Sequence, residues 1–186
     1  MQSDWLNLSQ PQVLWVMVAL HLGIYAGIWY VVARLKTPMT QAMRLMAAFN
    51  TALALCLLLV ALRGHVPDIV SKAPANVLSL LAFVALWGGG LRLLGVQPPR
   101  KEPLFLLVVG IAAILGLGLN PAWGNQRVAV GFFVLVWLIL RAWYLVREPL
   151  CQRHAGVATW SLTLAAWVIA GVLFTKAVGG IWWGWP

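Results

Sequence analysis

The chain has 186 residues, of which 62% are hydrophobic and only 9% are charged. A soluble domain carries about 25% charged residues, so a chain of this composition cannot cover a water-facing surface and must face lipid. Its apolar runs are long and rich in Leu, Ala and Val, whereas the strands of a membrane β-barrel alternate polar and apolar residues. The composition therefore predicts an all-α protein, a polytopic transmembrane helical bundle that forms a single domain.

Basic residues greatly outnumber acidic ones, with 13 Lys and Arg against 4 Asp and Glu and a net charge of +9. In a soluble protein this excess would suggest a nucleic-acid partner, but such proteins gather their basic residues on one face. Here the basic residues are scattered between apolar runs, as topology signals are in membrane proteins. We therefore expect the lipid bilayer, and no nucleic acid, as the surroundings of this chain.

Six apolar runs follow one another along the chain, and a helix needs about 20 apolar residues to cross the hydrocarbon. The predicted spans are residues 12–33, 45–62, 77–96, 104–119, 128–146 and 160–183. Most prolines fall between these runs, where residues that break helices are expected. The prolines predicted to separate the spans are Pro38, Pro67, Pro74, Pro98, Pro99, Pro103, Pro121 and Pro149.

The basic residues also predict an orientation, because positively charged loops stay on the cytoplasmic side. The larger group follows the first, third and fifth spans: Arg34, Lys36, Arg44, Arg92, Arg100, Lys101, Arg141, Arg147 and Arg153. The smaller group is Arg63, Lys72, Arg127 and Lys176. Both termini are therefore predicted to lie outside the cell, in the periplasm if the membrane is a bacterial inner membrane.

The chain has twelve tryptophans, and this residue favours the headgroup level, where its ring is in apolar surroundings and its N–H is hydrated. The tryptophans predicted near the outer interface are Trp5, Trp123, Trp182, Trp183 and Trp185. Those predicted near the inner interface are Trp29, Trp87, Trp143 and Trp160. We interpret both groups as interfacial belts.

Acidic residues fall in loops or at the ends of spans: Asp4, Asp68, Glu102 and Glu148. A proton-coupled carrier usually needs a carboxylate within the membrane. The sequence therefore disfavours a proton-driven pump or carrier.

His21 lies deep inside the first predicted span. An imidazole at that depth suits haem or metal binding, or proton sensing. A buried b-type haem normally takes two histidines at matched depth, but His65 sits at the end of the second span and His154 in a loop. The simpler interpretation is a neutral histidine that hydrogen-bonds to a neighbouring helix.

Four other polar residues are candidates for contacts inside the membrane. Asn50 in the second span and Asn76 at the start of the third are predicted to hydrogen-bond between helices. Arg92 and Arg141 lie within a turn or two of a span end, from which an arginine reaches the headgroups. We consider a contact with a lipid phosphate or another ligand for these residues.

Small residues mark two predicted contact regions. Ala19, Gly23 and Gly27 recur every four residues in the first span, a spacing that places them near one face and permits close helix approach. We expect them to pack within the bundle, with dimerisation as the alternative. Residues 88–90 are three consecutive glycines, which weaken a helix and predict a kink or a close contact there.

The segment Leu86 to Arg92, Leu-Trp-Gly-Gly-Gly-Leu-Arg, is followed by Pro98-Pro99-Arg100, and Arg127 and Arg141 bracket the fifth span. This pattern resembles the multi-helix membrane input regions that precede the catalytic domain of many bacterial diguanylate cyclases. The resemblance covers about the second to the fifth span and implies a membrane-embedded sensory module. The nucleotide-cyclising domain and its signature motif are absent from these residues.

No motif for catalysis or metal binding stands out, so we expect a non-catalytic module rather than an enzyme. It would be a sensory unit, or an accessory or assembly subunit that meets other membrane subunits or a second copy of itself. One alternative is a small transporter or channel whose path includes Asn50, Asn76, His21 and Arg92. Another is an electron-transfer protein that binds haem or quinone at His21.

Overall fold

The computed structural model describes residues 9–35, 37–99, 101–118, 124–153 and 157–182. In chain order the helices are α1 (Gln10–Ala33), α2 (Thr40–Ala61), α3 (Asp68–Leu93), α4 (Lys101–Gly118), α5 (Gly124–Arg153) and α6 (Val157–Trp182). The described part of the chain contains no β-strand, only one isolated bridge in the turn between α2 and α3. The predicted all-α class is therefore confirmed.

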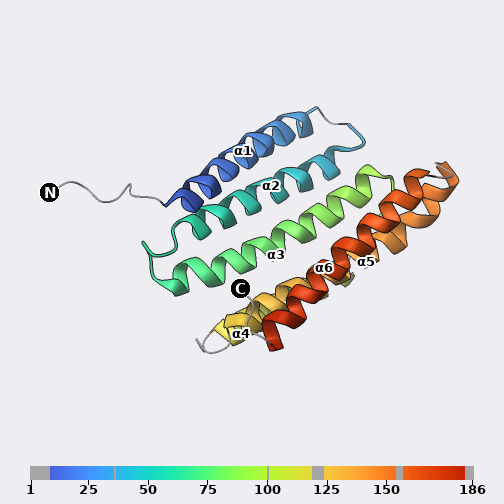
Figure 1. Ribbon diagram of the computed structural model, residues 1–186. Helices are drawn as coiled ribbons and strands as arrows, with labels where there is room; N and C mark the ends of the chain where they lie inside the picture. The colour runs from blue at the N-terminus through green and yellow to red at the C-terminus, as the bar shows by residue number, and fades with distance from the viewer. Residues whose placement is uncertain (1–8, 36, 100, 119–123, 154–156, 183–186) are drawn as a thin grey trace.

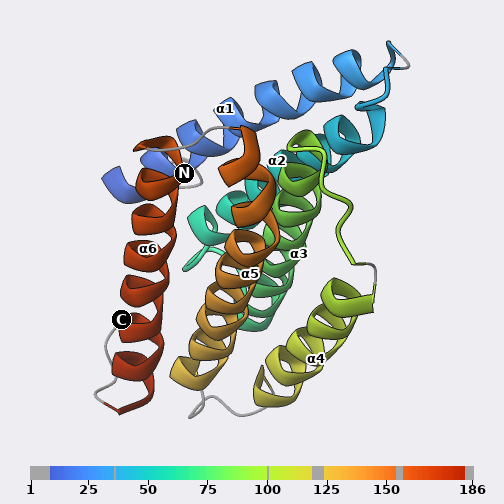
Figure 2. The ribbon, with the colours of Figure 1, turned by 90° about the vertical axis from the view of Figure 1, so that its right-hand side faces the viewer.

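The helices form an open array rather than a closed ring. Helices α1, α2 and α3 lie side by side in one layer, α4 and α5 lie beside α3, and α6 lies beside α5 (Figures 1 and 2). Helix α3 packs against α2, α4 and α5, while α5 packs against α3, α4 and α6. Helices α1 and α6 each pack against one neighbour, α2 and α5 respectively, so the two ends of the array are open.

The apolar core lies between the three central helices. It consists of Leu80, Trp87 and Leu91 from α3, Ile114 from α4, and Val134 and Leu138 from α5. Trp87 is only 6% exposed, so the prediction that it belongs to an interfacial belt is wrong. Its position near a span end suggested the headgroups, but α3 has neighbours on several sides and its indole is enclosed by them.

Four helical segments are long and apolar enough to cross a membrane: Gln10–Ala33, Thr40–Ala61, Val70–Leu93 and Ala129–Pro149. Helix α6 contains a shorter apolar stretch, Thr163–Gly179. Helix α4 has 18 residues, which is about 27 Å at 1.5 Å per residue, against a hydrocarbon thickness of about 30 Å. The structure thus supports a membrane-embedded helical bundle, while the count of six spans stays a prediction.

Two of the prolines predicted to separate spans lie inside helices instead. Helix α3 begins nine residues before the predicted span and includes Pro74, and α5 continues beyond the predicted end and includes Pro149. A proline has a φ angle that suits a helix and removes one backbone hydrogen bond. The remaining bonds and contacts of these long helices outweigh that single loss.

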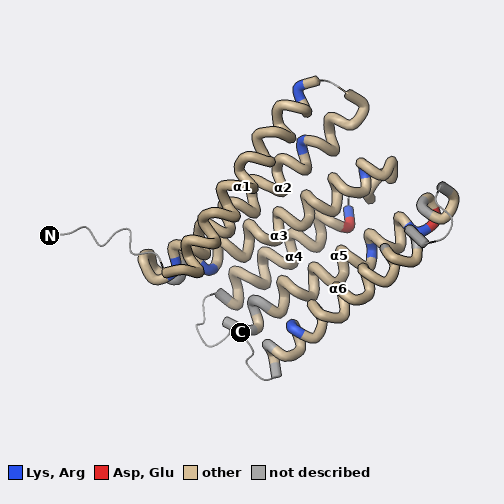
Figure 3. Tube along the Cα trace, turned by 45° about the horizontal axis from the view of Figure 1, so that its top comes forward, with Lys and Arg blue, Asp and Glu red and all other residues tan. Residues whose placement is uncertain are grey.

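Basic residues lie mostly near one end of the array, where α1, α3 and α5 finish (Figure 3). The members of this group whose side chains the structure describes are Arg34, Arg44, Arg92, Lys101, Arg141 and Arg147. We call this side the basic end. The opposite end is fixed by Gln12, whose Nε2 donates to the carbonyl of Arg63 at 3.0 Å and so joins the start of α1 to the end of α2.

Candidate functional site

A polar pocket opens at the basic end, between the start of α2 and the end of α3. Its volume is about 290 Å³. The residues that line it are Pro38, Met39, Gln41, Ala42, Arg92, Gly95, Val96, Gln97 and Pro98. Arg92 is the charged side chain in this lining, and we call the cavity the Arg92 pocket.

One wall of the Arg92 pocket is made by the turn that ends α3. Gly95 has a φ of 77°, a left-handed conformation that glycine adopts without strain. Its N–H bonds to the carbonyl of Arg92 at 3.0 Å, and the N–H of Val96 bonds to the carbonyl of Leu91 at 2.9 Å. This is a Schellman cap, and it leads the chain directly to Gln97 beside the start of α2.

The floor of the Arg92 pocket is set by a close approach of α2 and α3. A Cβ atom added at Gly89 would lie 3.1 Å from the sulfur of Met46 and 3.3 Å from the carbonyl oxygen of Ala42. Ala42 also lines the pocket. Of the two expectations for the glycine run, a kink or a close contact, the close contact is what the structure shows.

The Arg92 guanidinium is half-buried, and its Nη1 donates to the carbonyl of Gly88 at 3.1 Å. A guanidinium has five N–H donors, so one bond to its own helix leaves several for a ligand. Met39, the residue before α2, provides no side-chain cap for the helix, and N–H groups at a helix start attract anions. The amides of Gln41 and Gln97 add polar contacts, so the lining suits an anionic group.

The other predicted arginine is engaged within the chain. Arg141 Nε lies 2.8 Å from Glu102 Oε2, and its Nη2 lies 2.7 Å from Oε1. This bidentate pair occupies two donors of the Arg141 guanidinium, and the contact with a lipid phosphate suggested for Arg141 stays a prediction. The hydrogen bond from Arg141 also lowers the pKa of Glu102 below its ordinary value of 4.5.

The two asparagines do not join the Arg92 pocket. Asn50 is 5% exposed, but its Nδ2 donates to the carbonyl of Met46 in its own helix at 2.8 Å. Among the described residues, the interhelical bond predicted for it is therefore not formed. Asn76 is the ninth residue of α3 rather than its first. At 1.5 Å per residue, Asn50 lies about 15 Å and Asn76 about 25 Å from the basic end, at different depths.

His21 lies on the exposed side of α1, and its Nδ1 bonds to the carbonyl of Met17 at 2.8 Å. It therefore bonds to its own helix and not to a neighbour. The hydrogen bond from Gln12 to the carbonyl of Arg63 places the α2–α3 turn, which holds His65, at the level of Gln12. His21 lies nine residues beyond Gln12 along α1, a distance of about 13 Å. The two histidines are thus at unmatched depths. Among the described residues, no three His, Cys, Asp or Glu side chains gather to hold a metal.

The small residues of α1 are divided between two faces. Ala19 is 3% exposed and packs toward α2, but a Cβ added at Gly23 or Gly27 would meet nothing within 4 Å. Steps of four residues rotate by about 40° around a helix of 3.6 residues per turn, so the row turns away from α2. Packing of Gly23 and Gly27 inside the bundle is therefore a wrong prediction.

A second candidate site, which the sequence did not suggest, lies between α3, α5 and α6. It consists of two adjoining cavities of about 260 and 320 Å³. Both are lined by Leu94, Ile139, Ala142 and Val146, and we call them together the α3–α5–α6 groove. Almost all of its lining is apolar, so it suits a molecule from the bilayer rather than from water.

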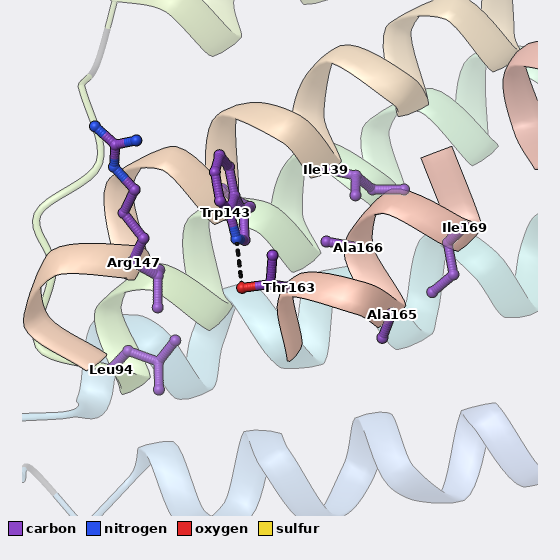
Figure 4. A pocket seen from close by; sticks show the side chains of 10 residues that line it. Leu94, Ile139, Trp143, Arg147, Thr163, Ala165, Ala166 and Ile169 are labelled. Carbon is purple, nitrogen blue, oxygen red and sulfur yellow. Dashed lines mark hydrogen bonds between the residues drawn. The ribbon is translucent and has the colours of Figure 1, made fainter. Parts of the chain in front are cut away.

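Two tryptophans line the α3–α5–α6 groove, and their N–H groups differ. Trp143 Nε1 donates to Thr163 Oγ1 at 3.0 Å, which joins α5 to α6 (Figure 4). Trp87 Nε1 is buried and has no hydrogen-bond partner in the part of the chain that the structure describes. A buried donor without an acceptor costs about 1–3 kcal/mol, so this N–H needs an explanation.

The sequence gives no signal for this groove because it depends on α6 packing against α5 and leaving α3 uncovered. No model of a protein family matches the chain, and neither does any curated protein or solved structure. The functional argument therefore rests on the residues of the two sites themselves.

Proposed function

We propose that this chain is a non-catalytic integral membrane module that binds a phosphate-bearing anion in the Arg92 pocket. It would act as a sensory unit or as an accessory subunit of a larger membrane complex. The observation that carries the proposal is the polar cavity of about 290 Å³ around Arg92 at the basic end of an otherwise apolar protein. An ionisable side chain within a membrane-spanning segment is costly and is a functional candidate for that reason, and Arg92 lies within the apolar segment Val70–Leu93.

The chemistry of the lining supports an oxyanion as the ligand. The planar guanidinium of Arg92 matches the geometry of phosphate oxygens. Its anchoring bond to Gly88 holds the group at the cavity and lowers the entropy that binding would remove. Both a phospholipid headgroup and a soluble phosphate compound present this chemistry at the basic end.

The position of the Arg92 pocket supports a sensory or regulatory role. Its walls come from the start of α2 and the end of α3, so an anion bound there would contact both helices. A ligand shifts an equilibrium between two conformations by its difference in affinity for them. An anion in this pocket would therefore stabilise the packing of α2 on α3.

The test compares Arg92→Gln with Arg44→Gln, which removes the same charge from an exposed residue of α2 outside the pocket lining. Thermal unfolding is measured in nanodiscs of phosphatidylcholine, with phosphatidylglycerol or inorganic phosphate as separate additions. We expect one addition to stabilise the parent protein and Arg44→Gln, but not Arg92→Gln. The addition that acts identifies a lipid headgroup or a free phosphate as the ligand. Equal responses of all three proteins would refute the proposal.

We also propose the finer topology: six spans in a bacterial inner membrane, with both termini in the periplasm. The excess of basic residues at one end of the array supports this orientation. Reporter fusions at the C-terminus and within residues 98–103 should report opposite sides of the membrane. Two reporters on the same side would rule out this topology.

An accessory role would need a surface for another membrane protein, and the outer face of α1 supports it. Gly23 and Gly27 lie on this face with open space around them, which suits close approach by another helix. The resemblance to the input regions of diguanylate cyclases supports the sensory alternative. Extraction in mild detergent distinguishes the two, since an accessory subunit should co-purify with a defined partner or with a second copy of itself.

A further inference from the structure

Helix α1 has an outer face that no described helix covers. It lies at the edge of the array and packs only against α2 among the described elements (Figure 1). Its buried residues, Ala19 and Ala33, are on the side of α2, and exposed residues recur on the opposite side in alternating steps of three and four. We call these residues the α1 seam: Leu14, Met17, His21, Ile24, Ile28 and Val31. Each of the five apolar members is at least 52% exposed. This spacing is the one by which two helices pack along their length.

His21 is the polar member of the α1 seam and lies at its middle. It is the twelfth of the 24 residues of α1, a helix long and apolar enough to cross the membrane. Ionisable side chains within a membrane almost always face protein or water rather than lipid. An apolar seam alone would suit lipid as well as another helix, but an imidazole at this depth favours a protein neighbour.

The polar groups of this face are one acceptor and one donor. His21 Nδ1 lies 2.8 Å from the carbonyl oxygen of Met17. Because a carbonyl only accepts, Nδ1 carries the hydrogen, and Nε2 of the neutral ring is left as an acceptor. Tyr25 lies beside the seam, one turn beyond His21, and is 54% exposed. No residue that the structure describes bonds to its hydroxyl. Long side chains of a helix lean toward its N-terminus, which brings this hydroxyl toward the level of His21.

We propose that the α1 seam packs against the α1 seam of a second copy of this chain, with the Tyr25 hydroxyl of each copy donating to His21 Nε2 of the other. Copies of one chain share one orientation in the membrane, so the two α1 helices run parallel and equal positions lie at equal depths. A two-fold axis brings the same surface of both copies together. Each copy then supplies one donor and one acceptor, so the second copy satisfies both groups. The proposal rests on the membrane-spanning position proposed for α1 and not on an anion in the Arg92 pocket.

The experiment measures energy transfer between copies of the whole chain in phosphatidylcholine liposomes, over a series of falling protein-to-lipid ratios. The dyes are attached to Cys151, which is exposed, whereas Cys56 is buried. Tyr25→Phe removes the proposed donor and keeps the ring. Tyr30→Phe is the matched control, because Tyr30 is also 54% exposed on α1 but lies outside the seam, and its hydroxyl accepts from Arg34. We expect the parent protein and Tyr30→Phe to dimerise alike. Tyr25→Phe should need about tenfold higher protein density, the effect of losing two weak hydrogen bonds in a membrane.

His21→Leu removes the acceptor and should weaken the dimer as much as Tyr25→Phe does, since lipid tails are as apolar as leucine. Because the two residues form one bond, the double variant should associate no more weakly than either single variant. Arg92→Gln should associate like the parent protein, whether or not an anion binds in the Arg92 pocket. A bilayer is used because a single copy in a detergent micelle has no second seam to meet.

Three results would overturn the proposal. Energy transfer no greater than that of random encounters at every density would mean that lipid or another protein covers the α1 seam. Equal association of Tyr25→Phe and the parent protein would refute the proposed bond. The third result concerns the face that is used. With Cys56→Ala and Cys151→Ser in place, Ile28→Cys should form a disulfide between copies, whereas Val172→Cys, at a residue 57% exposed on α6, should not. The reverse would show a dimer formed through another face.

Discussion

Arg141 and Glu102 form a two-pronged ion pair between α5 and the first turn of α4, with contacts of 2.8 and 2.7 Å. The residues are 39 positions apart, so the pair fixes how the short helix α4 sits against the longer α5. The Arg141 guanidinium also lies 5.3 Å from the centre of the Tyr144 ring. Both partners are accessible at the basic end, with 28% of the Arg141 side chain and 38% of the Glu102 side chain exposed.

This pair predicts a stability that depends on acid pH. The hydrogen bond from Arg141 lowers the pKa of Glu102 from its ordinary value of 4.5, so the folded state holds the ionised form more firmly than the unfolded chain does. The contribution of the ion pair to the free energy of unfolding is fully present above pH 4.5 and is lost as the pH falls through the lowered pKa of Glu102. For an accessible pair it amounts to at most about 1 kcal/mol.

Unfolding of Glu102→Gln and of the parent protein at pH 7 and pH 3 checks this expectation. Glu102→Gln should be less stable at pH 7, and the difference should close at pH 3. Glu148→Gln controls for the loss of one negative charge outside the pair. A difference between Glu102→Gln and the parent protein that is the same at both pH values would contradict the assigned ion pair.

Two glycines of α4 should respond differently to substitution by alanine. A Cβ added at Gly110 would lie 2.6 Å from a methyl carbon of the buried Leu80, whereas one added at Gly116 would meet nothing within 4 Å. Alanine improves helix propensity by about 1 kcal/mol at either position. Overpacking of a core costs about 1–3 kcal/mol, so Gly110→Ala should be less stable than Gly116→Ala by about that amount. Unfolding in detergent micelles measures this difference, and equal stabilities would show that α4 is not held against α3 at Gly110.

The helical class of this protein could be predicted from its sequence because a long apolar run leaves a chain few alternatives in a membrane. The ends of the helices were less predictable. The sequence pattern predicts Pro74 as a helix breaker, yet it lies inside α3, because a proline removes one backbone hydrogen bond and a long helix retains many. The opposite error concerns Trp87, whose place along the chain predicts an interfacial position but which is packed with residues of α4 and α5.

The candidate sites were predictable only in part. An arginine near a span end is costly and therefore a candidate for function, and Arg92 does line a polar pocket. Arg141 is a candidate for the same reason, but no local pattern indicates that Glu102, 39 positions away, would bind it. The row from Ala19 to Gly27 illustrates a third difficulty, since a four-residue spacing does not follow the face of a straight helix. The α3–α5–α6 groove depends on which helices stay apart, and no local pattern encodes that.

The hydrogen bond between Trp143 and Thr163, at 3.0 Å, predicts a measurable coupling between α5 and α6. Among the described elements α6 packs only against α5, so this bond belongs to the one interface that holds α6 in place. Thr163→Val removes the acceptor and should destabilise the protein by about 0.6–2 kcal/mol. A double-mutant cycle with Trp143→Phe isolates the pair. Additive effects of the two substitutions would mean that the bond contributes nothing to the docking of α6.

The two faces of α1 predict contrasting results for two leucine substitutions. Ala19 is buried against α2, and a larger side chain there should cost about 1–3 kcal/mol through overpacking. His21 lies on the exposed face, and among the described residues its imidazole bonds to the carbonyl of Met17 in its own helix. That carbonyl also accepts the backbone N–H of residue 21, as in any α-helix. His21→Leu should therefore change the free energy of unfolding by less than about 0.5 kcal/mol.

Unfolding of Ala19→Leu and His21→Leu in the same detergent measures both changes, and Gly23→Leu extends the series on the open face. Gly23→Leu should be tolerated because a Cβ added at Gly23 would meet nothing within 4 Å. A large loss of stability in His21→Leu would show that the imidazole holds a partner, and an absorption spectrum of the parent protein would then decide whether that partner is haem. If Ala19→Leu were neutral instead, α1 would not pack on α2 through the face described, and the orientation assigned to Gly23 and Gly27 would fail with it.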